Sequence, residues 1–198
     1  MKYRLILASN SPRRSELLSG LGFSFETRVL SGIDESWPDS LHGEEIPLYI
    51  SRIKADAYRD SMAVDELIIT ADTIVYLDQR VLGKPHDTVH ACSMLRLLSG
   101  KWHDVITGVT LTTVDYQKSF SVTTRVKFAH LSDDEIKKYV DSCAPFDKAG
   151  AYGIQEWIGY IGVERIEGSY FNVVGLPVQR LYRELEPLLS QRTDTLSV

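Results

Sequence analysis

Hydrophobic residues in the first half of the chain follow two spacings, which predict strands and helices in alternation. Runs that are apolar throughout and rich in β-branched residues are typical of buried strands. Apolar residues three and four positions apart predict amphipathic helices. By these criteria we expect strands at about residues 3–8 and 67–77, and helices at about 12–21, 46–61 and 87–100.

In the second half of the chain, two long β-type segments follow each other directly. Residues 105–114 and 119–128 are joined by a short polar stretch and predict an antiparallel hairpin. A capping box at Ser132 predicts the next helix. After it we expect a glycine-rich loop at 145–159, short strands at 160–166 and 170–174, and a last helix from Pro177 that Pro187 ends or kinks. The pattern predicts an α/β protein with a mixed sheet, and 198 residues suit one domain.

Composition and charge argue against several classes of function. The 22 basic and 27 acidic residues give a net charge of −5, whereas non-specific nucleic-acid binding needs a basic surface. Cys92 and Cys143 form no CxxC pair, which favours reduced thiols over a structural zinc site. No run approaches the roughly 20 apolar residues that a membrane span requires, and the apolar run near the N-terminus is too short for a signal peptide. We therefore expect a cytoplasmic protein that binds neither nucleic acid nor membrane.

The first predicted helix carries two positive charges where helices favour negative ones. Ser11 is a natural N-cap, and Pro12 fits the first helical position. Arg13 and Arg14 therefore fall in the first turn, where the helix dipole is already positive. A bound anion would resolve this conflict, because helix N–H groups, two guanidinium groups and the hydroxyls of Ser9 and Ser11 form a suitable phosphate cradle. The alternative is an exposed helix start whose arginines lie in water.

A second candidate is a carboxylate within the long buried strand. Asp72 cannot remain ionised there without a partner or a metal, and Thr73 adds a hydroxyl beside it. The alternative is a structural Asp that accepts backbone or hydroxyl hydrogen bonds. Asp34 and Glu35 lie in a polar segment, where an acidic pair is usually solvated. If that segment folds back towards Asp72, the carboxylates could hold a hard cation such as Mg²⁺ together with substrate phosphates.

Two lysines and a glutamine complete the candidates. Lys84 lies between Gly83 and Pro85, whose restricted backbone suits a fixed positive charge, although a surface turn would have the same sequence. Lys54 borders the apolar face of its predicted helix, and a packed stem with the ammonium in water would explain it equally well. Gln155 ends a glycine-rich segment, and its amide could pair with a base edge. An ordinary surface loop is the alternative for that segment.

Taken together, these residues resemble the signature of the Maf nucleotide pyrophosphatases. The motifs occur in order over nearly the whole chain, at residues 8–14, 16–18, 34–35, 54, 71–73, 83–85, 98–100, 147–155, 168–170 and 174–177. The resemblance implies cleavage of a nucleoside triphosphate to the monophosphate and pyrophosphate with a divalent metal cation, Mg²⁺ or Mn²⁺. It also implies one two-lobed domain over residues 1–198, with an elongated mixed sheet, flanking helices and a central cleft, similar to the inosine triphosphate pyrophosphatases. A homodimer is a further expectation from the resemblance.

Three positions distinguish the branches of this family. Arg13, Thr73 and Gln155 match the dTTP/UTP branch, whereas the 7-methyl-GTP branch typically has Trp, Gln and Glu at these places. The resemblance thus implies hydrolysis of dTTP and UTP, or of modified pyrimidine nucleotides, with Asp72 as the proton acceptor.

From the residues and the resemblance we expect metal-assisted attack of water at the α-phosphate. The triphosphate would lie over the first helix, with Glu35 and Asp72 as metal ligands. The expected substrate-binding residues are Ser9, Ser11, Arg13, Arg14, Lys54, Thr73, Lys84 and Gln155. The alternative is a nucleotide-binding regulator of septum formation without turnover, which would need the cationic cradle but not a water-activating Asp72.

Overall fold

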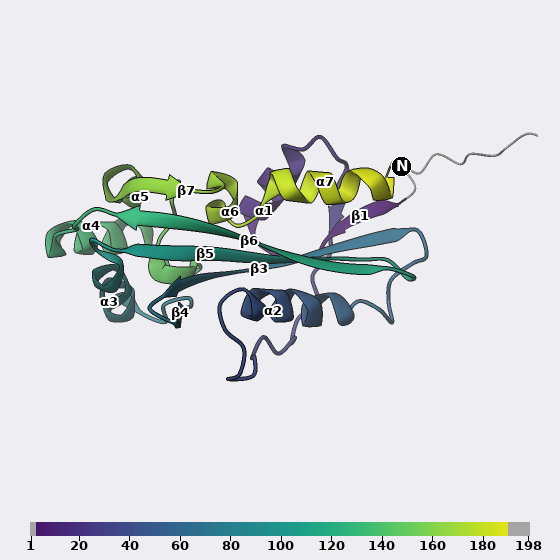
Figure 1. Cartoon of the computed structure of the whole chain (residues 1–198), viewed down its shortest axis with the longest axis horizontal. Helices are drawn as coiled ribbons and strands as arrows, with labels where there is room; N and C mark the ends of the chain where they lie inside the picture. The colour runs from purple at the N-terminus through teal and green to yellow at the C-terminus, as the bar shows by residue number, and fades with distance from the viewer. Residues whose placement is uncertain (1–2, 190–198) are drawn as a thin grey trace, which may run out of the picture.

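The computed structural model describes residues 3–189 and shows a long mixed sheet with helices on both faces (Figure 1). Its strands are β1 (Arg4–Leu7), β2 (Phe25–Thr27), β3 (Glu66–Leu77), β4 (Arg80–Leu82), β5 (Trp102–Thr112), β6 (Gln117–Phe128) and β7 (Val163–Glu167). Its helices are α1 (Pro12–Ser19), α2 (Glu45–Asp56), α3 (Thr88–Leu98), α4 (Asp133–Cys143), η1 (Ala149–Ala151), α5 (Trp157–Gly162), α6 (Tyr170–Val174) and α7 (Val178–Leu189).

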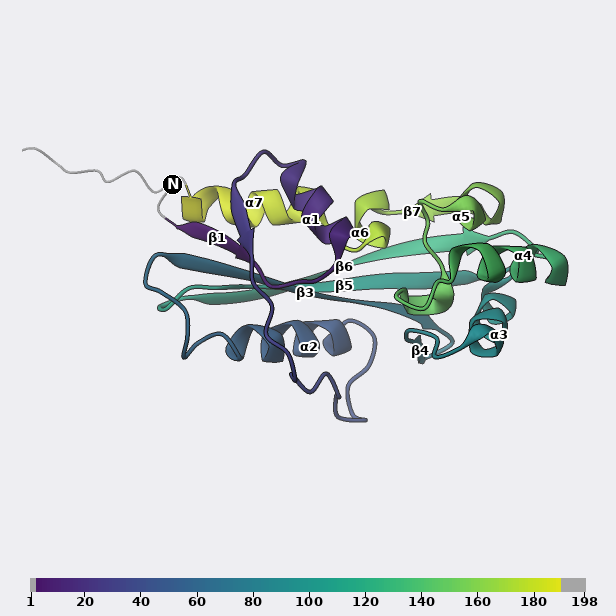
Figure 2. The same ribbon diagram turned by 180° about the vertical axis from the view of Figure 1, so that it is seen from behind.

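The seven strands form one sheet in the order β2-β1-β3-β5-β6-β7, with β4 added beside β3. Strand β1 is parallel to β2 and to β3, and the other pairs are antiparallel. Helices α1, α6 and α7 cover one face, α2 covers the other, and α3 and α4 gather at one end (Figures 1 and 2). The prediction of an α/β protein with an elongated mixed sheet is confirmed.

Buried side chains form two large clusters along the sheet. One lies at the end of the sheet where α3 and α4 pack and includes Leu95 and Tyr139. The other lies beneath α1 and α7 and includes Leu18 and Leu181. The assignment of residues 1–198 to one two-lobed domain stays a prediction, and residues 1–2 and 190–198 lie outside the described part. No helix within residues 3–189 combines the length and apolar character needed to cross a bilayer.

Several local predictions are confirmed. The hydroxyl of Ser11 accepts a hydrogen bond from the Arg14 N–H at the start of α1. The Asp87 carboxylate likewise caps α3, and Ser132 forms the predicted capping box with Glu135. The predicted hairpin is the β5–β6 pair. Short polar side chains before an amphipathic run were therefore reliable signals, because they satisfy the free N–H groups at helix starts.

Other local predictions were wrong. Residues 170–174 form helix α6 instead of a strand, because the Ser169 hydroxyl caps it and Gly175, with φ of 130°, ends it. The segment expected as a strand at 160–166 begins as α5 and becomes extended only in β7. The helix expected to reach residue 61 ends at Asp56, and α7 continues past Pro187. Strands β2 and β4 were not predicted, because three-residue strands leave no periodic signal.

The arrangement of strands around β3 leaves part of one edge open. Strand β1 pairs with residues 66–69 and β4 with residues 75–77, so residues 70–74 have β5 on one side and no described strand on the other. Because successive side chains of a strand point to opposite faces, Asp72 and Thr73 face different sides of the sheet at this gap. The gap lies beside the turn from β1 to α1.

A glycine brings helix α2 close to this gap. Gly108 of β5 pairs with Asp72, and a Cβ atom on it would lie 2.3 Å from the Pro47 carbonyl oxygen. Only glycine therefore allows α2 to pack directly on β5. This close packing carries Lys54, in the last turn of α2, over β3 on the side of Asp72.

Candidate active site

A cleft of about 670 Å³ opens at the free edge of β3. Its walls come from the β1–α1 turn, the segment before α2, the turn after β4 and the segment from Asp147 to Gln155. The structure brings all of the site residues expected from the sequence to this cleft: Ser9, Ser11, Arg13, Arg14, Glu35, Lys54, Asp72, Thr73, Lys84 and Gln155. Their roles in binding and catalysis stay predictions.

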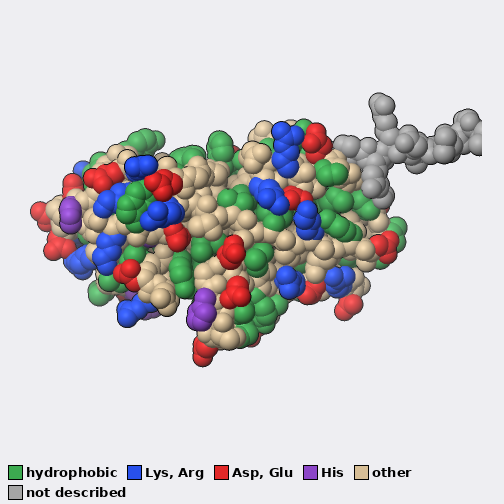
Figure 3. All heavy atoms as spheres, viewed as in Figure 1, with side chains coloured by type: hydrophobic (Ala, Val, Ile, Leu, Met, Phe, Trp, Pro, Cys, Tyr) green, Lys and Arg blue, Asp and Glu red, His purple; other side chains and the backbone are tan. Residues whose placement is uncertain are grey.

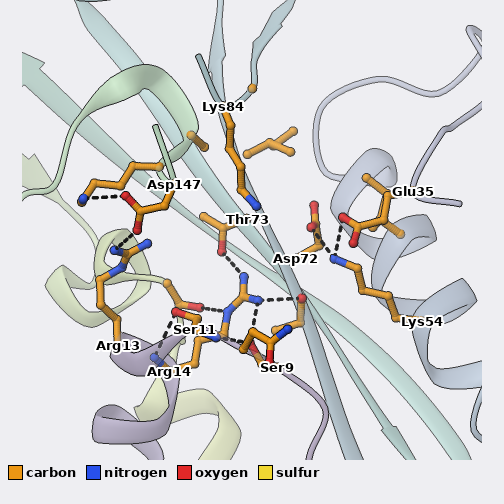
Figure 4. A pocket seen from close by; sticks show the side chains of 18 of the residues that line it. Ser9, Ser11, Arg13, Arg14, Glu35, Lys54, Asp72, Thr73, Lys84 and Asp147 are labelled. Atoms are coloured by element: carbon orange, nitrogen blue, oxygen red, sulfur yellow. Dashed lines mark hydrogen bonds and ion pairs between the residues drawn. The ribbon is translucent and has the colours of Figure 1, made fainter. Parts of the chain in front are cut away.

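On one side of the cleft, Glu35, Lys54 and Asp72 form a group that we call the Lys54 cluster. The Lys54 ammonium lies 2.9 Å from Oδ1 of Asp72 and 2.9 Å from Oε2 of Glu35 (Figure 4). The side chains of Lys54 and Asp72 are each only 14% exposed. Within residues 3–189, no hydrogen bond engages Oδ2 of Asp72 or Oε1 of Glu35. The polar segment thus folds back on Asp72, and one oxygen of each carboxylate remains available.

Arg14 is tied to the protein backbone and to β3. Its Nε donates to the Gly175 carbonyl and one Nη to the Ala71 carbonyl, both at 2.9 Å, and the other Nη donates to Oγ1 of Thr73 at 3.0 Å. A longer bond of 3.5 Å reaches the Ser9 hydroxyl. Burial lowers the pKa of Arg14, and the charge of Asp72 opposes this shift. Because a guanidinium has five N–H donors, these bonds leave Arg14 one for a substrate.

Thr73 takes part in the same hydrogen-bond network. Besides accepting from Arg14, its hydroxyl lies 2.9 Å from the hydroxyl of Thr107 on β5. The geometry therefore makes Thr73 a support for the Arg14 side chain, and a direct contact with substrate would have to break into this network.

Arg13 points to the other side of the cleft, where Asp147, Lys148 and Glu156 form what we call the Lys148 cluster. Arg13 donates to Oδ2 of Asp147 at 2.8 Å. The Lys148 ammonium lies 2.7 Å from Oδ1 of Asp147 and 2.9 Å from Oε1 of Glu156. Burial raises the pKa of Asp147, but hydrogen bonds from Lys148 and Arg13 outweigh it and hold that pKa at about 2.

The sequence interpretation missed the Lys148 cluster. It placed Asp147 and Lys148 in a glycine-rich loop without a role and did not consider Glu156. The only signals were Glu156, next to Gln155, and Lys148, eight positions before Glu156. Charge alternation in a loop does not reveal which charges meet.

Lys84 and Gln155 are exposed side chains at the cleft. The Lys84 ammonium points between Thr73 and Asp72 (Figure 4). In the described part of the chain, neither Lys84 nor Gln155 has a side-chain hydrogen bond or ion pair. Trp37, which the sequence interpretation did not select, also lines the cleft. Lys84 and Gln155 are thus free to contact a ligand.

The Lys54 cluster is the place where a divalent cation fits best. No group of three or more metal-binding side chains occurs among residues 3–189. Mg²⁺, however, commonly binds through one or two carboxylates and completes its octahedral shell with water and substrate phosphates. The two unengaged oxygens of Glu35 and Asp72 match that requirement, so these residues suit a cation that is shared with a bound polyphosphate.

Comparison with known proteins supports the expected family. The family described as "Maf-like protein" matches residues 4–188. The chain belongs to the Maf family. Curated relatives of this Maf protein include dTTP/UTP pyrophosphatases of Phocaeicola vulgatus, 65% identical over 94% of this chain and 97% of the relative, and of Bacteroides thetaiotaomicron, 61% identical with the same coverage. A more distant one from Christiangramia forsetii is 45% identical over 95% of each chain.

A solved structure with little sequence similarity shares the fold of this Maf protein. The HAM1 protein from Coxiella burnetii has a TM-score of 0.50 and 13% sequence identity, and the match covers 93% of this chain and 99% of that one. This likeness concerns the sheet and its flanking helices alone.

Proposed function

We propose that this Maf protein hydrolyses dTTP and UTP to the nucleoside monophosphate and pyrophosphate. The observation that carries the proposal is the Lys54 cluster, in which Asp72 presents one unengaged carboxylate oxygen to a cleft lined by cations. The names of relatives that are 45–65% identical over nearly the full length support the same activity. A carboxylate in this position suits the activation of a water molecule.

The charges of the cleft suit a polyphosphate, although the protein as a whole is acidic. The chain has a net charge of −5, and Figure 3 shows acidic and basic side chains intermixed over one face. Cations outnumber carboxylates in the cleft lining, which contains Arg13, Arg14, Lys54, Lys84 and Lys148 against Glu35, Asp72 and Asp147. A concave, locally positive surface concentrates anions.

In the mechanism we propose, the water oxygen attacks the α-phosphorus and a proton of that water passes to the Asp72 carboxylate. The bond from the α-phosphorus to the α–β bridging oxygen breaks, and pyrophosphate leaves with that oxygen. Lys54 orients Asp72, while Lys84 and Arg13 neutralise charge on the phosphates. A divalent cation held by Glu35 and Asp72 would supply further charge neutralisation. Positioning and electrostatic stabilisation provide most of the acceleration in reactions of this kind.

Gln155 is the residue that we expect to recognise the base. Its side chain is exposed at the cleft, so its amide is free to donate one hydrogen bond and accept another. Uracil and thymine present neighbouring donor and acceptor groups on one edge. We expect a larger purine to fit less well beside the 147–155 segment, which the Lys148 cluster anchors.

Pyrophosphate release from the common nucleoside triphosphates, measured with Mg²⁺ and with Mn²⁺, tests the proposal. We expect turnover with dTTP and UTP well above that with purine nucleotides. A preference for GTP or its 7-methyl derivative would overturn the substrate assignment. Tight binding of dTTP without pyrophosphate release would overturn the enzyme assignment in favour of a nucleotide-binding regulator.

A further inference from the structure

Glu156 has no part in the proposed hydrolysis, yet it lies at one end of an unbroken series of charged contacts. Its Oε1 lies 2.9 Å from the Lys148 ammonium, which in turn lies 2.7 Å from Oδ1 of Asp147. The other oxygen of Asp147 accepts from Arg13 at 2.8 Å. The series therefore joins Glu156 to a guanidinium at the cleft without a gap longer than an ordinary hydrogen bond.

The far end of this series is anchored in the protein core. The Tyr139 hydroxyl donates to Oε2 of Glu156 and accepts from the Gly153 N–H at 3.0 Å. Tyr139 is fully buried in α4, and its pKa is raised by burial and by the hydrogen bond to Glu156. Both carboxylate oxygens of Glu156 are therefore engaged. The Glu156 carboxylate is therefore held in place by Tyr139 of helix α4 and by Lys148.

Close packing holds the middle of the series against the backbone. The Lys148 side chain is 10% exposed. A Cβ atom at Gly153 would lie 2.8 Å from Cδ of Glu156 and 3.0 Å from Cε of Lys148, closer than side chains tolerate. The Lys148–Glu156 pair thus rests directly on the backbone two residues before Gln155. Displacement of this pair would move the segment that carries Gln155.

We propose that Glu156 is a positioning residue that holds Arg13 in its binding orientation through Lys148 and Asp147. This inference rests on the proposed function, because it assigns Arg13 to the nucleotide. Without the negative charge at Glu156, Asp147 is the only carboxylate partner that Lys148 keeps among residues 3–189. The ammonium then competes with Arg13 for Asp147, and the guanidinium loses its fixed direction.

Steady-state kinetics of Glu156→Gln test the proposal, because this change keeps the size of the side chain and removes only its charge. We expect KM for dTTP and UTP to rise about five- to tenfold and kcat to stay within about twofold, since ordering of a binding group is lost and the reacting groups are untouched. In an Arg13→Ala background, the same change should alter KM less than about twofold, because residues that act in series do not have additive effects.

Glu164→Gln is the matched control. Glu164 is an exposed glutamate in β7 outside the cleft lining, so the variant loses the same charge without touching the series. It should keep wild-type KM. Wild-type KM in Glu156→Gln, or an equal rise in KM with and without Arg13, would overturn the proposal.

Two further measurements separate folding and turnover from positioning. Melting temperatures show whether Glu156→Gln folds. If it does not, Tyr139→Phe replaces it as the test variant, because it removes only the hydroxyl that holds Glu156. This change should raise KM about two- to threefold. Kd for a dTTP analogue with a methylene group between the α- and β-phosphorus is measured in parallel. If the wild type releases no pyrophosphate, the proposed function is wrong. The role of Glu156 is then decided by Kd for the analogue, for which we expect the same fold-changes as for KM.

Discussion

The two sides of the cleft use the same local arrangement, a lysine between two carboxylates, in different ways. In the Lys54 cluster, Glu35 and Asp72 each have one oxygen on the lysine and one without a partner among the described residues. In the Lys148 cluster, every carboxylate oxygen of Asp147 and Glu156 is engaged by Lys148, Arg13 or Tyr139. One cluster has hydrogen-bonding capacity to spare, and the other has none.

This difference indicates how the work of the cleft is divided. Unengaged carboxylate oxygens can take a proton or bind a cation, so the Lys54 cluster suits chemistry. A cluster whose oxygens are all bonded can only hold its neighbours in place, so the Lys148 cluster suits positioning. The four carboxylates thus acquire separate roles because their second oxygens differ in whether another side chain of the protein engages them.

The sharpest way to break this comparison is to neutralise one aspartate on each side. Asp72→Asn should lower kcat about 10²–10⁴-fold with little change in nucleotide affinity, because general-base catalysis is lost. Asp147→Asn should raise KM about tenfold and change kcat little, because Arg13 loses its partner. Pyrophosphate release and nucleotide titration measure both. If Asp72→Asn keeps near-wild-type kcat, or Asp147→Asn is the more damaging to kcat, the assignment of roles is wrong.

The second prediction concerns acid sensitivity on the side of the Lys148 cluster. His103 is buried, and its Nε2 lies 2.8 Å from the hydroxyl of Tyr152, in the segment between Lys148 and Gln155. Burial lowers the pKa of His103 from 6.5 to about 4. Between pH 6.5 and pH 4 the unfolded chain therefore binds more protons than the folded protein. The contribution of His103 to the free energy of unfolding is fully present above pH 6.5 and is lost as the pH falls towards 4. The shift corresponds to about 3 kcal/mol of unfolding free energy.

Urea unfolding at pH 7, 5.5 and 4.5 measures this loss. His103→Phe should flatten the dependence in that range, since the replacement side chain does not titrate. A wild-type unfolding free energy that stays constant from pH 7 to 4.5 would show that His103 is not the buried neutral group described here.

The third prediction separates the clusters by their response to metal. Glu35→Gln should raise the Mg²⁺ concentration needed for half-maximal activity about tenfold, because one of two proposed carboxylate ligands is lost. Glu156→Gln should leave that concentration unchanged when nucleotide is saturating. Titration of activity with Mg²⁺ measures both variants, and an equal shift in the two would remove the distinction between the clusters.

The smallest expected effect is on stability. Glu156→Gln should lower the free energy of unfolding by about 1–2 kcal/mol, because it removes one partner of the buried Lys148 ammonium and of the buried Tyr139 hydroxyl. Glu35→Gln should change it by less than about 0.5 kcal/mol, because the Glu35 side chain is 54% exposed and exposed ion pairs contribute little. Urea unfolding at pH 7 measures the free energy of unfolding of both variants. A larger decrease for Glu35→Gln than for Glu156→Gln would contradict the structural role of the Lys148 cluster.

The same contrast explains what could be predicted from the sequence. Asp72 and Lys54 could be selected because a charge in an apolar strand, or beside an apolar helical face, conflicts with its local pattern. Glu35 lies in a polar segment without such a conflict, and it was a candidate only on the condition that this segment folds back towards Asp72. Glu156 conflicts with nothing in a polar loop. Its importance arises from Lys148 and Tyr139, and contacts between separate segments do not appear in local periodicity.

Fold prediction succeeded and failed for related reasons. The long strands β3, β5 and β6 and the helices with side-chain caps have strong periodic or terminal signals. Segment 170–174 is apolar enough for a strand, yet its Ser169 cap and Gly175 end make it helical. The direction of Arg14 was also unpredictable, because the carbonyls of Ala71 and Gly175 meet it only once the sheet has formed.

The central claim is that the cleft directs water to the α-phosphorus of a pyrimidine nucleoside triphosphate. Hydrolysis of dTTP by the wild-type protein in ¹⁸O-labelled water, followed by mass spectrometry of both products, tests this most directly. We predict one ¹⁸O atom in the monophosphate and none in the pyrophosphate. Label in the pyrophosphate, or release of labelled inorganic phosphate, would contradict it.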